Sequence, residues 1–160
     1  MKQRWKWMGI TGLAGIAGAA GLTWSAMATN GDATAITVYK TPTCDCCTYW
    51  EDHLRENGFT VESVETNQQE INQVRRDHGI TPELVSCHVG VIDGYAIEGH
   101  VPAADIERLL EEELDIAGLS VPGMPIGSPG MEMPNQPDDA YDVVAFNEQG
   151  QTRVFNRYTP

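Results

Sequence analysis

The tightest constraint on this chain is a run of thiols placed where a strand pattern gives way to a helix pattern. Cys44, Cys46 and Cys47 fall within four residues, and Cys87 is the fourth and last cysteine. A disulfide stabilises a fold mainly by closing a long loop of the unfolded chain, and a Cys44–Cys47 bond closes a very short one. A bond between the neighbours Cys46 and Cys47 is strained. The crowding therefore favours soft-metal or thiol redox chemistry over a disulfide framework.

The segments around the thiols predict a mixed α/β domain. Their β-branched and aromatic content predicts strands at 35–39, 59–64, 85–92 and 95–98. Start and stop signals predict helices at 44–57, 68–78 and 102–115. The order β-α-β-α-β-β-α, with thiols between the first strand and the first helix, is that of a thioredoxin-like domain. In that plan the loop entering the third strand lies against the helix start, so we expect Cys87 to face Cys44 and Cys47.

A different composition follows the third predicted helix. Residues 118–137 are rich in Gly and Pro and contain methionines, which predicts a loop rather than a helix. Two short strand patterns over 141–158 then predict a C-terminal β-hairpin. We therefore expect residues 29–160 to form a single domain, with its core over about 34–115.

The N-terminal residues 1–28 have the pattern of an export signal. Three basic residues precede a Gly- and Ala-rich apolar stretch, and small residues lead up to Ala28, after which we expect cleavage. The apolar stretch is only marginally long enough to span a bilayer. An uncleaved membrane anchor is the alternative.

The charge of the expected mature chain excludes one class of partner. Residues 29–160 keep 7 Lys and Arg against 23 Asp and Glu, a net charge of −16. A nucleic-acid partner is incompatible with that balance. The acidity is interpreted as a solvated, soluble surface, and long-range attraction of cations is the alternative. The run Glu111-Glu112-Glu113 is interpreted as a solvated helix end and not as a metal site.

The spacing of the thiols allows two kinds of chemistry. Cys44 and Cys47 stand three residues apart on one face of a helix start, where free amides and the helix dipole stabilise thiolates. Such a pair normally indicates disulfide exchange. Cys46 adds a third thiolate, and Cys87 brings the sulfurs to four, enough for one tetrahedral ion or a small thiolate-bridged cluster.

Imidazoles and thioethers supply further candidate ligands. His88 and His100 are near the predicted third and fourth strands, although strand alternation directs His88 away from Cys87. Met124 and Met131 lie in the predicted loop and have thioethers that suit Cu(I). The other interpretation is that the apolar side chains of these methionines pack on the domain and hold the loop in place. His53 is expected to be exposed, and His78 to interact with the dipole at a helix end.

Taken together, these residues resemble the exported, thioredoxin-like CopG proteins of bacterial copper-resistance operons. The resemblance runs from Ile36 to the terminal hairpin, and four stretches carry it: Thr43–Cys47, Ser86–His88, Gly94-Tyr95 with Glu98–Pro102, and Val121–Glu132. It implies a periplasmic copper-binding protein of copper tolerance, with other periplasmic copper-handling proteins as partners. It also implies Cu(I) bound by the thiolates of Cys44, Cys46, Cys47 and Cys87, including a multinuclear sulfur-bridged form. Interconversion of Cu(I) and Cu(II), as by a copper oxidoreductase, is a further implication.

Three alternatives remain at this point. A thiol–disulfide oxidoreductase would use Cys44 and Cys47 and be indifferent to Cys46. A thioredoxin-like iron–sulfur protein also needs four cysteines. Such clusters are usually loaded before export, however, and the predicted signal indicates that this chain is exported unfolded. A zinc site is the third alternative, and its lack of colour would distinguish it from an iron site.

Overall fold

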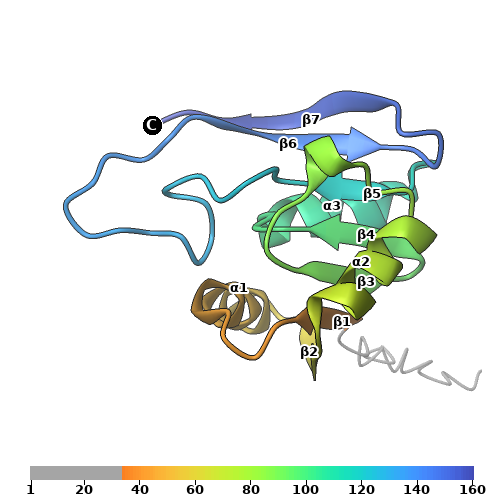
Figure 1. Cartoon of the computed structure of the whole chain (residues 1–160). Coiled ribbons are helices and arrows are strands. Elements are labelled where there is room, and N and C mark those ends of the chain that lie inside the picture. Colours follow the sequence, from red (N-terminus) through yellow and green to blue (C-terminus); the bar gives the residue numbers. More distant parts are fainter. Residues whose placement is uncertain (1–33) are drawn as a thin grey trace, which may run out of the picture. The chain divides into compact units, whose positions relative to one another are not determined.

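One seven-stranded mixed sheet organises the molecule (Figure 1). The computed structural model describes residues 34–160. In chain order the elements are β1 (Ala35–Lys40), α1 (Asp45–Glu56), β2 (Thr60–Glu65), α2 (Gln68–Asp77), the 3-10 turn η1 (Pro82–Leu84), β3 (Val89–Ile92), β4 (Tyr95–Glu98), α3 (Ala103–Glu112), β5 (Gly118–Ser120), β6 (Tyr141–Phe146) and β7 (Thr152–Tyr158). The strands lie side by side in the order β2-β1-β3-β4-β5-β6-β7, which puts β4 at the centre.

The mixed α/β class and the predicted element order are confirmed. Strands and helices up to α3 follow the sequence β-α-β-α-β-β-α, with η1 as a short insertion. β1 runs parallel to β2 and antiparallel to β3, and β3 forms a hairpin with β4. Asp93 and Gly94 connect that hairpin with φ angles of 47° and 83°, as a tight two-residue turn requires. The assignment to the thioredoxin-like class stays a prediction.

The third strand is shorter than predicted, because its first four residues leave the sheet. β3 begins at Val89, whereas the sequence pattern placed the strand start at 85. The backbone N–H of Ser86 donates to the Glu98 carboxylate, and its C=O accepts from the Arg75 guanidinium. Since these backbone groups bond with side chains, residues 85–88 form a loop and not a strand.

The predicted loop over 118–137 begins with a strand that sequence analysis missed. β5 pairs parallel with β4 and antiparallel with β6, and thereby joins the predicted terminal hairpin of β6 and β7 to the same sheet. A Cβ atom on Gly118 would overlap the carbonyl oxygen of Ala96, so the two strands need a glycine here. Three residues are too few for a period-2 pattern to be recognised.

Helices cover both faces of the sheet. Alternate residues of β1 face opposite sides, as a strand requires. One core cluster joins side chains of α1 and α3 to the sheet, among them Trp50, Leu54, Ile106, Leu109, Ile36 and Val38. The other joins α2 and η1 to the opposite face, through Ile71, Leu84, Val89, Ala96 and Phe146. α3 ends at Glu112, earlier than predicted, because Glu113 adopts a left-handed conformation with φ 45°.

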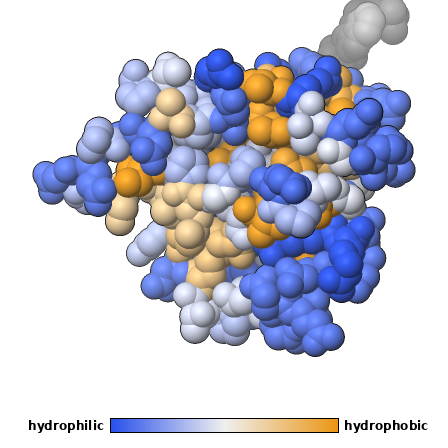
Figure 2. Space-filling model, turned by 45° about the horizontal axis from the view of Figure 1, so that its top comes forward, coloured by the Kyte–Doolittle hydropathy of each residue, from blue (hydrophilic) through white to orange (hydrophobic). Residues whose placement is uncertain are grey.

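Polar side chains cover much of one face of the molecule, interrupted by smaller apolar areas (Figure 2). Glu111, Glu112 and Glu113 are all exposed, in agreement with a solvated helix end. Among residues 34–160, no helix is both long and apolar enough to cross a membrane. The predicted export signal over 1–28 lies outside the described residues.

Candidate metal centre

The four cysteine sulfurs gather at the start of α1. Cys44 is the residue that precedes the helix, Cys46 and Cys47 lie in its first turn, and Cys87 comes from the loop before β3. Their sulfur atoms all lie within 4.8 Å of one another. The Sγ atom of Cys46 is 3.6 Å from that of Cys44 and 3.8 Å from that of Cys87. The chain therefore brings together thiols that are 41 residues apart, as the expected position of Cys87 required.

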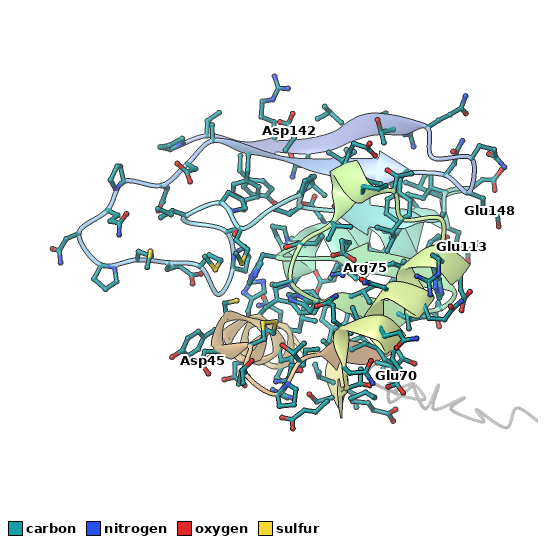
Figure 3. All side chains as sticks on the ribbon, viewed as in Figure 1. Asp45, Glu70, Arg75, Glu113, Asp142 and Glu148 are labelled. Atoms are coloured by element: carbon teal, nitrogen blue, oxygen red, sulfur yellow. A yellow bond between two sulfur atoms is a disulfide. The ribbon has the colours of Figure 1, made fainter. Side chains whose placement is uncertain are left out.

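Two of the four thiols are joined in a disulfide. Cys44 is bonded to Cys47, while Cys46 and Cys87 are free. The bond spans three residues, so it closes too short a loop to contribute much to the stability of the fold. Cys47 is fully buried and the other three cysteines are partly exposed. Figure 3 shows sulfur atoms gathered at α1, the helix on which exposed Asp45 is labelled.

Two buried histidine side chains also contact the Cys87 sulfur. The Sγ atom of Cys87 is 3.2 Å from Nδ1 of His88 and 3.1 Å from Nε2 of His100. The expectation that strand alternation turns His88 away from Cys87 is wrong, because residues 87 and 88 lie outside β3. Cys87, His88 and His100 form a second group of ligand atoms within 4.8 Å. Cys87 thus belongs to both a group of four sulfurs and a group of one sulfur and two imidazoles.

Burial keeps both imidazoles neutral and able to act as ligands. It lowers the pKa of His100, and it lowers the pKa of His88 well below the usual value, helped by the neighbouring His100 and Arg75. The Nδ1 atom of His100 donates to the carbonyl oxygen of Pro129 at 2.8 Å, which leaves the Nε2 lone pair directed at Cys87. Within residues 34–160, Nε2 of His88 is buried with no hydrogen-bond partner. Such an unpaired buried nitrogen is costly, because it has lost its hydrogen bonds to water.

Burial favours the protonated form of the Cys87 thiol. Burial, followed by the neighbouring Cys46, raises the pKa of Cys87 to about 12. A soft cation displaces such a proton when it binds, because only the thiolate is a ligand.

The Gly- and Pro-rich loop is attached to this centre. Beyond Pro129, which holds His100, Gly130 packs on the backbone of α1 with φ +82°. A Cβ atom on Gly130 would stand 2.7 Å from the backbone nitrogen of Trp50. Trp50 is fully buried, donates to the carbonyl oxygen of Val101 at 2.8 Å, and has its ring centroid 4.3 Å from that of His88.

The two candidate thioethers have different positions. Met131 lines a pocket of about 500 Å³ together with Cys46, and Met133 lines the same pocket. Met124 is 52% exposed and does not line this pocket. Of the two predicted thioether ligands, Met131 is therefore at the edge of the thiol group and Met124 is not.

The other two histidines have structural contacts. His53 is half-buried, contrary to the expectation of exposure, and its Nε2 atom accepts from the backbone N–H of Ala103 at 3.1 Å. His78 follows the end of α2 and bonds through Nδ1 to the carbonyl oxygen of Val74 at 2.8 Å, near the helix terminus where it was expected.

The sequence analysis did not predict a buried ion pair that lies next to the loop carrying Cys87. Arg75 of α2 and Glu98 of β4 are 2.7 Å apart, with side chains 5% and 0% exposed. Figure 3 labels Arg75 where α2 faces the sheet. The available signal was position: Arg75 follows the buried Ile71 by four residues, so both lie on the inner face of α2.

Comparisons with known proteins place the chain in a family. A family profile described as "Protein of unknown function, DUF411" matches residues 84–131, a segment that contains Cys87, His88 and His100. No curated protein matches the chain. A solved structure named "Copper resistance protein copG", form 1, is 44% identical with a TM-score of 0.74, and the match covers 81% of this chain and 100% of that one. Form 2 is also 44% identical, with a TM-score of 0.73 and coverage of 80% and 100%. The chain therefore belongs to the CopG family of copper resistance proteins.

Proposed function

We propose that this protein binds Cu(I) through Cys44, Cys46, Cys47 and Cys87 and acts in copper tolerance in the periplasm. The observation that carries the proposal is the gathering of four sulfur atoms within 4.8 Å. Two sulfurs that share one tetrahedral ion at bond lengths of about 2.3 Å stand roughly 3.8 Å apart. The distance of 3.8 Å between the free thiols of Cys46 and Cys87 suits a shared ion, and Cys44, 3.6 Å from Cys46, joins them once its disulfide with Cys47 is reduced. Soft thiolates favour Cu(I), and both solved relatives are named copper resistance proteins.

The Cys44–Cys47 pair supports a redox role for the same centre. Oxidation of this dithiol to the disulfide releases two electrons and two protons, and the electrons reduce two Cu(II) ions to two Cu(I) ions. In the reverse step two Cu(I) ions give up one electron each, two protons are taken up, and the disulfide becomes two thiols that can rejoin the ligand set. We therefore propose that the protein interconverts Cu(I) and Cu(II), with Cys46 and Cys87 outside the disulfide and available to bind copper in both states of the pair.

The second ligand group supports handling of both oxidation states. Imidazole suits Cu(II) as well as Cu(I), whereas thiolates and thioethers favour Cu(I). Cys87, His88 and His100 are proposed to hold Cu(II), and the four cysteines to hold Cu(I) in mononuclear or sulfur-bridged form. Of the two candidate thioethers, Met131 and Met124, Met131 has the position that supports a role beside Cys46. Other periplasmic copper-handling proteins are proposed as donors or acceptors of the ion.

A thiol–disulfide oxidoreductase is the second candidate function. The observation in its favour is the Cys44–Cys47 disulfide at a helix start, where a thiolate is stabilised. Exchange between protein disulfides needs only those two cysteines. The two functions therefore differ in their dependence on Cys46.

The deciding experiment is an anaerobic Cu(I) titration of reduced residues 29–160, in which Trp50 is the only tryptophan, against a chromogenic chelator, with tryptophan emission followed in parallel. We expect tight binding of more than one copper ion per chain, and a loss of that binding in Cys46→Ser. An insulin-reduction assay on both proteins measures disulfide exchange, and circular dichroism checks that the variant folds. Unchanged copper stoichiometry in Cys46→Ser contradicts the four-sulfur site. Exchange activity without copper binding favours the oxidoreductase.

A further inference from the structure

The loop that carries Cys87 is held by side chains and not by strand pairing. The N–H of Ser86, the residue before Cys87, donates to Oε1 of Glu98 at 2.7 Å. The C=O of Ser86 accepts from Nη2 of Arg75 at 3.0 Å. One buried ion pair therefore binds both backbone polar groups of the residue next to the shared cysteine.

The ion pair is itself rigidly held. Nε and Nη2 of Arg75 donate to the two carboxylate oxygens of Glu98 at 3.0 and 2.7 Å, and Nη1 donates to Asn72 at 3.0 Å. This two-pronged geometry is specific to a guanidinium. Glu98 lies in the central strand β4, opposite Val89 of β3 and Ser120 of β5, so its backbone is fixed from both sides. The pair thus connects α2, the centre of the sheet and the Cys87 loop.

The ion pair is close in sequence or in contact with the segments that carry Cys87, His88 and His100. Ser86 directly precedes Cys87 and His88, and Glu98 is two residues before His100. The N–H of Gly99 donates to the carbonyl oxygen of His88 at 3.0 Å. Gly99, with φ +74°, packs so closely on Ser86 that a Cβ atom would stand 2.5 Å from the Ser86 Cβ. Cys87, His88 and His100 therefore depend for their relative positions on one small unit of buried contacts.

Fold stability alone does not explain a buried ion pair here. Removing two charges from water is expensive, and apolar pairs of similar volume are commonly as stabilising or more so. An apolar pair, however, has no donor or acceptor for the peptide groups of Ser86. We propose that Arg75 and Glu98 are positioning residues of the metal centre. They hold the Cys87 sulfur where it can bind the same ion as the neighbouring ligands. The proposal rests on the function proposed above.

The test replaces the pair by apolar residues of similar size. In Arg75→Met/Glu98→Leu no charge is left unpaired, so we expect the variant to fold with a melting temperature equal to or above that of the native protein. We expect its Cu(I) affinity, measured by chelator competition, to fall by about 10- to 100-fold, the loss typical when supporting contacts of a metal ligand are removed. Asp142→Leu/Arg157→Met removes an exposed ion pair on β6 and β7 and is the matched control, with native affinity expected.

A second measurement works without copper. In the oxidised protein only Cys46 and Cys87 react with iodoacetamide, and mass spectrometry separates their peptides. We expect the double variant to alkylate Cys87 faster than the native protein does, with the rate at Cys46 unchanged because α1 holds it. Unchanged alkylation at Cys87, or native copper affinity in a folded variant, overturns the proposal.

Two further outcomes keep the interpretations separate. If the native protein binds no Cu(I), the proposed function fails, and the alkylation ratio of Cys87 to Cys46 alone decides whether the pair positions Cys87. If the double variant does not fold, Arg75→Lys replaces it, because lysine keeps the charge but lacks the two-pronged geometry. Native copper affinity and native Cys87 reactivity in Arg75→Lys then overturn the proposal.

Discussion

The Nε2 atom of His100 lies 3.1 Å from the Sγ atom of Cys87, although the two residues are 13 positions apart. This contact makes Cys87 the residue at which a sulfur group and an imidazole group meet. Pro129 orients the imidazole from the Gly- and Pro-rich loop, and the Arg75–Glu98 pair holds the peptide before the thiol. The positions of these candidate ligand atoms are thus set by contacts from three distant parts of the chain.

Substitution of His100 is expected to separate the two ligand groups. His100→Gln removes the nitrogen that faces Cys87 but no sulfur, so Cu(I) binding by the four cysteines is expected to persist. Cu(II) affinity is expected to fall by about 10- to 100-fold. Electron paramagnetic resonance of Cu(II)-loaded protein and Cu(I) competition measure the two effects. His78→Gln, at the end of α2, is the control with native behaviour, and equal losses for both oxidation states in His100→Gln count against separate groups.

Substitution of Gly130 is expected to lift the loop from α1. In Gly130→Ala the new Cβ atom meets the backbone of Trp50, in addition to the cost of a left-handed conformation. Gly123→Ala is the matched control, because Gly123 has φ +72° and nothing within 4 Å of a Cβ atom. Urea denaturation is expected to show a loss of about 1 kcal/mol in the control and about 2–3 kcal/mol in Gly130→Ala. Similar losses for the two variants contradict a close approach of the loop to α1.

Reduction of the Cys44–Cys47 disulfide is expected to change stability little. The chain-entropy argument for a loop of this length gives a decrease in the free energy of unfolding of about 2 kcal/mol at most. Denaturation with and without reductant measures the difference. Cys46→Ser keeps the disulfide and should show the same dependence on reductant. A much larger decrease would mean that the bond is a structural one, which would weaken the redox interpretation.

Tyr158 is expected to make stability depend on alkaline pH. Its hydroxyl donates to Asp105 at 2.8 Å, and burial, followed by this hydrogen bond, raises the pKa of Tyr158 above its ordinary value near 10. The folded state favours the protonated phenol, so this contribution is complete below about pH 10 and is lost as pH rises through the raised pKa. Tyr158→Phe should be less stable than the native protein by about 1 kcal/mol at pH 8. That difference should shrink between pH 10 and 11 in denaturation experiments, and a constant difference would contradict the assignment.

Local sequence patterns were sufficient for the order of the elements and for the position of three cysteines at the start of one helix. Helix start signals, the Asp93-Gly94 turn and β-branched segments act between near neighbours, so the order from β1 to α3 was predictable. The spacing of Cys44, Cys46 and Cys47 likewise depends only on the first turn of one helix. The ends of the elements and the three-residue β5 were harder to predict from the sequence, because they depend on partners elsewhere in the sheet.

Only the tertiary structure decided which other residues join the thiols. His88 was expected to turn away from Cys87, but the Arg75–Glu98 pair removes its segment from the strand and with it the rule of alternation. Met131 and Met124 have the same chemistry, and packing of Gly130 on α1 brings only Met131 to Cys46. Arg75 and Glu98 are charged residues, a type that is mostly exposed, although the spacing from Ile71 places Arg75 on the inner face of α2. Their burial depends on a mutual contact 23 positions apart, and contacts of that range are determined by packing, which no local pattern specifies.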